Sequence, residues 1–436
     1  MKSVRQVAEM QAYTEAATSG LYAKQSGLVG KYDNVRKLWE DESTRIFLRP
    51  HLERLIDRRV SQMQRVRIMD LGCGSADGFE LLTGIRRRDA DLQDFEITLL
   101  NPSVLGRYHG VDLNEELIQQ AQYLYGDYGK LTFARADFSQ GLPLASEQRP
   151  YDLYFTSYGT CSHFTDDTSL IRLLAEIAAR TRDYCLIVCD WLGRYSYEWQ
   201  TLWSNDLTQN HTMDYVVSYI YDKEERERRR DELQHLRLRL MTRQEAEALV
   251  QEAGRRAGVP IRQLGFFDRS VLTGRHMDTA EYNPHAPPLR QAVNSLHEPS
   301  VRTDLGLLEF DYVPKPGFDF VNDYFEHLQM CWNMLVAYVE ELMLKYDEST
   351  QQYRSPPTPI PASYPQPLQE MMQRMRRVVE GTAWLGYGLP RENIIEPQLG
   401  FALRHLVVHL QQGFGCAHGL VGLFEVDKSE QKGTLG

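Results

Sequence analysis

The chain has 436 residues, of which 42% are apolar and 25% charged, a globular composition whose length predicts two domains or one domain with large additions. Its net charge of −11 argues against a broad nucleic-acid surface, which needs clustered basic residues. No signal peptide is evident, and no run approaches the ~20 apolar residues of a membrane span. We therefore expect a cytoplasmic protein without nucleic-acid or membrane contact.

Periodicity and capping residues predict alternating strands and helices along most of the chain. The predicted strands are 66–71, 108–113, 131–136, 151–157, 184–189, 236–240 and a closing pair, 261–267 with 270–273. The predicted helices cover most of 32–56, where Pro50 is expected to break or start a helix, then 79–85, 115–125 capped by Asn114, 168–180, 243–253 behind a capping box at Thr242, 321–346, 368–379 and 398–411.

This alternation predicts an α/β fold with a doubly wound, mostly parallel sheet. Residues 191–240 interrupt the pattern with aromatic and then charged sequence, including a charge run at 222–232, and we interpret them as a lid-like insertion. The predicted division is an N-terminal helical cap at 1–62, the sheet domain at 63–283 and a mainly helical region with proline-rich linkers at 284–436.

A glycine-rich turn follows the first predicted strand, with the spacing Gly72-x-Gly74-x-x-x-Gly78 after Asp70. Glycines permit unusual backbone angles and let a ligand lie directly on the main chain. A dinucleotide fingerprint would place Asp77 at its third glycine, where an acid sits badly against a pyrophosphate. An acid at Asp70 suits a ligand that carries a positive ammonium group.

The stretch 70–78 resembles motif I of the class I S-adenosylmethionine-dependent methyltransferases, roughly (E/D)-x-G-x-G-x-x-x-G, and the likeness continues in order over 66–190. The resemblance implies S-adenosylmethionine as the cofactor of the 63–283 domain. It implies that Asp112 takes the ribose hydroxyls, because a carboxylate accepts two hydrogen bonds from a vicinal diol. The full set of implied cofactor residues is Asp70, Gly72, Gly74, Gly78, Asp112, Leu113, Asp137 and Phe138 at the adenine, Ser157 near the methionine arm, and Tyr32 as a lid contact.

Methyl transfer mainly needs an in-line placement of acceptor and methyl group. A base is useful where the acceptor must lose a proton. His163 is the candidate base, since its ordinary pKa lies near neutrality, and Tyr158 is a candidate for orienting the acceptor. An irregular polar stretch at 86–108 looks like an insertion before Asp112. It leaves Asn101 as a second candidate for the ribose contact.

Two further groups of residues leave alternatives open. An aromatic cluster after the fifth strand would either line the acceptor pocket or pack a lid: Trp191, Tyr195, Tyr197, Trp199 and Trp203. His405 and His409 stand four residues apart on a predicted helix, as some metal ligands do, but no glutamate completes a zinc motif. The six cysteines show no metal-ligand spacing either, so we expect no metal and reduced, buried thiols.

The sequence therefore predicts a methyltransferase that modifies an oxygen or nitrogen of a small molecule. It lacks the Asn/Asp-Pro-Pro-Tyr/Phe pattern used on exocyclic base nitrogens. Alternatives that stay open are a protein or RNA acceptor, a nicotinamide-dependent oxidoreductase, and a non-catalytic scaffold that acts through residues 284–436. That same helical region is the candidate surface for self-association.

Overall fold

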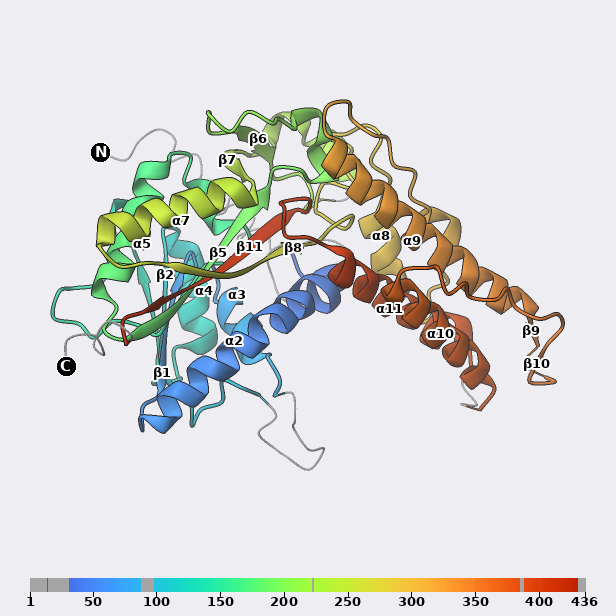
Figure 1. The fold of residues 1–436 in the computed structure, drawn as a ribbon, viewed down its shortest axis with the longest axis horizontal. Coiled ribbons are helices and arrows are strands. Elements are labelled where there is room, and N and C mark those ends of the chain that lie inside the picture. The colour runs from blue at the N-terminus through green and yellow to red at the C-terminus, as the bar shows by residue number, and fades with distance from the viewer. Residues whose placement is uncertain are drawn as a thin grey trace.

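A computed structural model describes residues 14, 31–87, 98–221, 223–347, 349–384 and 388–429. Of the predicted helical cap at 1–62, only residue 14 and residues 31–62 are described. Residues 88–97 of the predicted insertion at 86–108 lie outside the described residues, and so does Asp222 of the predicted charge run. Figure 1 shows a twisted sheet with helices on both faces and, beside it, a lobe built mainly from the C-terminal helices.

The described strands form one nine-stranded sheet and one small two-stranded pair. The strands of the large sheet are β1 (Val66–Leu71), β2 (Leu105–Asp112), β3 (Leu131–Arg135), β4 (Leu153–Phe155), β5 (Tyr184–Gly193), β6 (Thr212–Val216), β7 (His235–Met241), β8 (Arg262–Arg269) and β11 (Gly419–Asp427), and the small pair is β9 (Tyr346–Asp347) with β10 (Gln352–Tyr353). The helices are α2 (Asp41–Ser61), α3 (Asp77–Thr83), α4 (Glu115–Tyr125), α5 (Asp167–Arg180), α6 (Lys223–Arg228), α7 (Arg243–Ala257), α8 (Leu289–Leu296), α9 (Asp319–Lys345), α10 (Gln366–Gly381) and α11 (Glu396–Leu410).

The sheet runs in the order β3-β2-β1-β4-β5-β11-β8, and its first five strands are parallel. The predicted doubly wound, mostly parallel α/β sheet is confirmed, and β1 has the predicted bounds. The strand order reverses between β1 and β4. In open sheets of this kind, ligands bind beyond the carboxyl ends of the strands at such a reversal.

The C-terminal strand β11 lies inside the sheet, where it pairs antiparallel with both β5 and β8. The predicted closing strand at 270–273 is wrong, because Ser270 and Leu272 adopt φ values of 65° and 61°, which no extended strand accommodates. Residues 419–427 fill the place between the two strands and are almost wholly buried. The predicted boundary at residue 283 thus separates this strand from the sheet to which it belongs.

Two apolar cores cover the faces of the sheet. Helices α5 and α7 pack on one face, and α2, α3 and α4 pack on the other. The predicted Asn114 cap is confirmed, since its Oδ1 accepts the Leu117 N–H at 3.0 Å, and the capping box at Thr242 is also present. These caps satisfy N–H groups at helix starts, which have no partner within the helix.

Pro50 lies inside α2 rather than at a helix end, so the prediction of a break there is wrong. A proline removes one backbone donor and crowds the preceding turn. Leu48, Leu52 and Leu55 on the same helix are buried against the sheet. Most helix stability in proteins comes from such packing, which here outweighs the local cost of the proline.

A third apolar core joins the 191–240 insertion to helices α8–α11. Four of the five aromatic residues lie in this core, and Trp191 lies in the core on the α5–α7 face of the sheet. Trp203 stacks on Phe325 of α9 with ring centres 6.0 Å apart, and Trp199 is fully buried. None of the five cluster residues is among those that line the cavity described below. The cluster therefore packs the insertion against the helical lobe.

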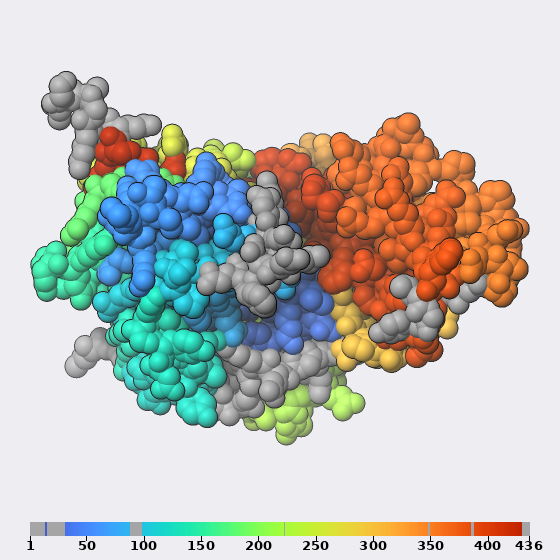
Figure 2. All heavy atoms as spheres, turned by 90° about the horizontal axis from the view of Figure 1, so that it is seen from below, coloured from blue at the N-terminus to red at the C-terminus, as the bar shows by residue number. Residues whose placement is uncertain are grey.

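Buried ion pairs connect the start of the described chain to α8. Arg290 donates to both oxygens of Asp33 at 2.7 Å and to Glu40 Oε1 at 2.6 Å, and all three side chains are nearly inaccessible. Burial alone would raise the pKa of Glu40, but Arg290, Arg275 and Arg269 hold it well below its usual value. In Figure 2 the dark blue start of the described chain lies between the sheet domain and the helical lobe.

Replacing Arg290 by methionine is expected to lower the free energy of unfolding by about 3–5 kcal/mol, because it leaves two buried carboxylates without their nearest charge partner. Denaturant unfolding followed by fluorescence measures this loss. The matched control is Arg376→Met, which removes a half-exposed pair with Glu380 and should cost less than about 1 kcal/mol. Equal losses in the two variants would contradict a structural role for the buried pairs.

Candidate cofactor and acceptor site

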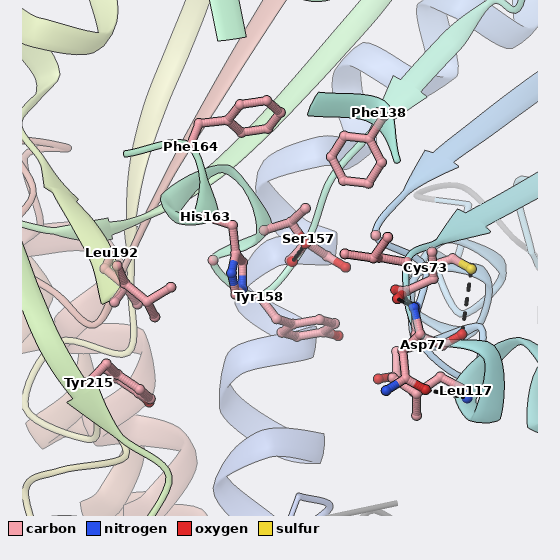
Figure 3. Close-up of a pocket in the computed structure, with 18 of the residues that line it drawn as sticks. Cys73, Asp77, Leu117, Phe138, Ser157, Tyr158, His163, Phe164, Leu192 and Tyr215 are labelled. Atoms are coloured by element: carbon pink, nitrogen blue, oxygen red, sulfur yellow. Dashed lines mark hydrogen bonds between the residues drawn. The ribbon is translucent and has the colours of Figure 1, made fainter. Parts of the chain in front are cut away.

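A cavity of about 480 Å³ opens at the carboxyl ends of β1, β2 and β4, at the reversal of strand order. Figure 3 shows Cys73, Asp77 and Leu117 on one side of it, Leu192 and Tyr215 on the other, and His163 with Tyr158 between them. The predicted site residues that line this cavity are Gly72, Gly74, Asp112, Leu113, Asp137, Phe138, Ser157, Tyr158 and His163. Asp70, Gly78 and Tyr32 are not among the lining residues.

The glycine turn brings main chain to the cavity wall. Gly72 and Gly74 have φ values of 78° and 52°, which residues with side chains rarely adopt. A Cβ on Gly72 would lie 2.6 Å from Cγ2 of Thr160, so the turn and the loop after β4 approach closely. A Cβ on Gly74 would meet nothing nearer than Asp77 Oδ2 at 3.9 Å, which leaves the backbone of this residue open to a ligand.

Gly78 and Asp70 pack against each other behind the turn. A Cβ on Gly78 would lie 2.2 Å from Asp70 Oδ2, so this glycine lets α3 approach the end of β1. Asp70 is fully buried and accepts a hydrogen bond from the Tyr108 hydroxyl, while its Oδ1 has no hydrogen-bond partner in the described structure. The expectation that Asp70 faces a ligand is not supported, because the turn covers it.

Asp77 is the acid that reaches the cavity from this turn. It pairs with Lys31 and accepts a hydrogen bond from the Tyr32 hydroxyl, and the Arg36 guanidinium lies 3.9 Å away. Burial would raise the pKa of Asp77, but Lys31 and Arg36 lower it to about 2. The N-terminal segment thus closes over the turn, with Lys31 and Arg36 lining the cavity and Tyr32 committed to Asp77.

Asp112 ties the end of β2 to the glycine turn. Its Oδ2 accepts the Gly74 N–H at 2.9 Å, and its Oδ1 accepts the Asn114 N–H at 2.9 Å. Each carboxylate oxygen has a second lone pair for a ligand hydroxyl. Asn101, the second candidate, lies before β2, and its Oδ1 accepts the Ser103 N–H at 2.9 Å within a turn. Asn101 is therefore excluded from the cavity.

The end of β3 supplies a polar and an aromatic side chain to the same wall. Asp137 Oδ1 accepts the Ser139 hydroxyl at 2.5 Å and its N–H at 3.1 Å. The ring of Phe138 lies 5.9 Å from that of Phe164, centre to centre. Both Asp137 and the two rings line the cavity.

The loop after β4 is held by a carboxylate at its base. Asp190 of β5 accepts the Tyr158 N–H at 2.8 Å and the Gly159 N–H at 3.1 Å. The Tyr158 hydroxyl donates to Asp41 at 2.8 Å, and the Arg36 guanidinium lies 3.4 Å from the centre of its ring. The hydroxyl proton of Tyr158 is therefore already donated to Asp41, and its predicted role in orienting an acceptor stays a prediction.

The wall opposite the glycine turn was not predicted. Its residues come from the end of β5, from the β6–β7 ribbon, from β8 and the segment that follows it, and from the position just before β11. They are Leu192, Tyr215, Tyr219, Leu238, Arg269, Arg275 and His418. The alternation at 236–240 pointed to a half-buried strand and could have indicated Leu238. No local pattern indicates Arg269 or His418, because only the sheet brings them to the cavity.

The cavity lies where the strand order reverses. The glycine turn after β1 lines it, together with Asp112 at the end of β2 and Asp137 after β3. The chain has a class I methyltransferase-like fold. No protein-family model matches the chain, and a search of curated proteins found no match.

Three solved structures illustrate the likeness. One, an S-adenosylmethionine-dependent methyltransferase from Clostridium acetobutylicum, is 14% identical with a TM-score of 0.34, over 59% of this chain and 90% of that one. CalS10, a SAM-bound amino pentose methyltransferase from Micromonospora echinaspora, is 12% identical with a TM-score of 0.31, over 60% and 93%. A putative methyltransferase in complex with the Trm112 activator from Haloferax volcanii is 19% identical with a TM-score of 0.27, over 48% and 65%.

His405 and His409 stack on each other on α11, with ring centres 3.9 Å apart. Across the described part of the chain, no group of three or more His, Cys, Asp or Glu side chains is arranged to hold a metal ion. All six cysteines are buried and unpaired by disulfides. None of the helices in the described ranges has the length and apolarity to cross a membrane.

The Asp70→Asn variant tests the buried carboxyl behind the turn. Burial, with Asp77 and Asp112 nearby, raises the pKa of Asp70 to about 7 even though the Tyr108 hydrogen bond opposes this. The folded protein therefore keeps a proton that the unfolded chain loses above about pH 4, so wild-type stability falls between about pH 4 and 7. The amide at position 70 of the variant cannot ionise. The free energy of unfolding of the variant minus that of wild type should therefore rise as the pH increases over that range.

Thermal unfolding of both proteins at about pH 5, 6, 7 and 8 measures this difference. Asp127→Asn is the control, because Asp127 is exposed. A constant gap between wild type and Asp70→Asn at every pH would show that Asp70 has an ordinary pKa.

Proposed function

We propose that this chain is an S-adenosylmethionine-dependent methyltransferase that transfers the methyl group to an oxygen or nitrogen of a small molecule. The observation that carries the proposal is one cavity with two unlike walls. The open main chain at Gly74 with Asp112 and Asp137 forms one wall. Apolar and aromatic side chains such as Leu192 and Tyr215, together with two arginines and a histidine, form the other.

The residues present fit S-adenosylmethionine. Asp112 would accept hydrogen bonds from the ribose hydroxyls. Phe138 and Leu113 would lie against the adenine ring, and Asp137 would accept a hydrogen bond from the adenine amino group. The backbone at Gly72 and Gly74 would lie under the methionine arm. When bound, the cofactor supplies an activated methyl group on a sulfonium, so this chain's residues need mainly to orient the acceptor and exclude water.

A small acceptor suits the dimensions of the cavity. Its volume of about 480 Å³ lies within the roughly 300–1,000 Å³ of small-molecule sites. The N-terminal segment covers it through Lys31 and Arg36, and the insertion covers it through Tyr215 and Tyr219. The acidic net charge of −11 disfavours a nucleic-acid acceptor.

Calorimetric titration of the full chain with S-adenosylmethionine, S-adenosylhomocysteine and NAD tests the cofactor assignment. The expected result is binding of the first two and no binding of NAD, because Asp77 occupies the position where a pyrophosphate would need a glycine. Preferential binding of NAD would replace this proposal with the oxidoreductase alternative.

The Asp112→Ala variant should weaken S-adenosylhomocysteine binding by about 10- to 100-fold, the loss expected when a carboxylate that accepts ligand hydrogen bonds is removed. Asp127→Ala, the exposed acid just after α4, is the matched control and should bind normally. Circular dichroism checks that both variants are folded. Unchanged affinity in Asp112→Ala would remove Asp112 from the cofactor site.

The acceptor is found by incubating whole cell extract with the protein and methyl-labelled S-adenosylmethionine, and then separating the small-molecule, protein and RNA fractions. A product with the mass shift of the labelled methyl group is expected with wild type and absent with Asp112→Ala. Labelling confined to protein or RNA fractions would overturn the small-molecule assignment.

A further inference from the structure

A histidine–carboxylate pair lies at the wall opposite the glycine turn. His418 directly precedes β11, lines the cavity and is 8% exposed. Glu198 belongs to the short helix η4 (Tyr197–Leu202) and is 1% exposed. Nδ1 of His418 lies 3.0 Å from each carboxylate oxygen of Glu198. The two residues are far apart in the sequence and meet only because β11 lies beside β5.

Glu198 is fixed by several donors besides His418. Its Oε1 accepts a hydrogen bond from the Ser196 hydroxyl at 2.9 Å, and its Oε2 accepts one from the backbone N–H of His276 at 2.6 Å. A Cβ on Gly274 would lie 1.8 Å from Oε1, so a glycine there makes room for the carboxylate. Burial would raise the pKa of Glu198, but His418 and His276 lower it, so the side chain is an ionised acceptor.

This arrangement fixes which nitrogen of His418 holds the proton. An ionised carboxylate at Nδ1 keeps the hydrogen on that atom, which leaves the lone pair of the neutral ring on Nε2. Nε2 of His418 has no hydrogen-bond partner among the described residues and is not sealed in the interior. An imidazole held in this way is suited to accept a proton from a ligand in the cavity.

Two other histidines near the cavity are less suited to this role. Burial lowers the pKa of His276 to about 3, and its Nε2 is sealed within the protein. Burial raises the pKa of Asp112, and His163, the predicted base, lies close enough for its charge to oppose that rise, which places His163 towards the glycine-turn side of the cavity. The His418 ring lies 6.2 Å from the ring of Tyr215, on the wall opposite the glycine turn, which is called the acceptor wall below.

The charges on the acceptor wall favour an oxygen acceptor. Arg269 and Arg275 are among the lining residues, and the guanidinium of Arg275 lies 5.4 Å from the centre of the Tyr219 ring. Both are paired with buried carboxylates, Arg269 with Asp190 and Arg275 with Glu40, so they would act as fixed donors that stabilise an oxygen as it gains negative charge. Leu192 and Leu238 give the same wall its apolar surface.

We infer that His418 is the general base, that Glu198 is its positioning residue, and that the acceptor is a hydroxyl compound with an aromatic or aliphatic body. The inference rests on the proposed function. The acceptor O–H bond breaks as its proton passes to Nε2 of His418. The oxygen's electron pair forms the new bond to the methyl carbon, the C–S electron pair returns to sulfur to leave a neutral thioether, and His418 later releases the proton to water.

Nitrogen-15 NMR of histidine-labelled protein with S-adenosylhomocysteine tests the pair without turnover. The His418 signals, identified by their loss in His418→Gln, should show a neutral ring with hydrogen on Nδ1 at about pH 8. In Glu198→Gln the ring should lose this preference. A wild-type His418 with hydrogen on Nε2 would overturn the inference.

Methyl transfer to a panel of catechol, 4-nitrophenol, benzyl alcohol, aniline and benzylamine supplies the second measurement. Hydroxyl compounds should be methylated, and His418→Gln should lower kcat by about 100-fold or more with unchanged affinity for S-adenosylhomocysteine. His285→Gln, an exposed histidine, is the control and should keep wild-type kcat. Transfer only to amines, no transfer to any hydroxyl compound, or loss of kcat in His163→Gln but not in His418→Gln would overturn the inference.

A His418 ring that keeps its hydrogen on Nδ1 in Glu198→Gln would contradict the positioning role. Failure of S-adenosylhomocysteine to bind wild type would instead reject the proposed function, so the two failures are distinguishable.

Discussion

The structure depends on a set of buried ion pairs that joins four separate parts of the chain. Arg290 of α8 holds Asp33 and Glu40 of the N-terminal segment, and Arg269 of β8 reaches Glu40 at 3.6 Å and Asp190 of β5 at 2.9 Å. Such charges are costly to bury unless all are paired. Because the same Asp190 also holds the loop after β4, the pairs fix both the packing of the lobes and one edge of the cavity.

The sheet, the N-terminal segment and the C-terminal region therefore all contribute residues that line the cavity. The glycine turn supplies main chain, and the N-terminal segment places Lys31 against Asp77 above it. The insertion supplies Tyr215, and the segment before β11 supplies His418. The third apolar core joins two of these parts, since it packs the insertion against helices α8–α11.

Glycines at the turn have two separate physical uses that the spacing alone did not distinguish. Gly72 and Gly74 have positive φ and bring backbone to the cavity. Gly78 instead makes room for the carboxyl of Asp70, which is buried behind the turn. The motif therefore predicted a ligand-binding turn, while the acid expected to face the ligand is turned inward and Asp77 reaches the cavity in its place.

The local sequence determined the parallel sheet, the bounds of β1, the caps at Asn114 and Thr242, and the strand-end acid Asp112, because hydrophobic period and capping act over a few residues. It did not determine the neighbour of β8, the position of Pro50 inside a helix, or the acceptor wall. Those depend on contacts between residues hundreds of positions apart, such as β11 with β5. Only the tertiary structure brought His418 to Glu198, because no local pattern encodes a pairing across 220 residues.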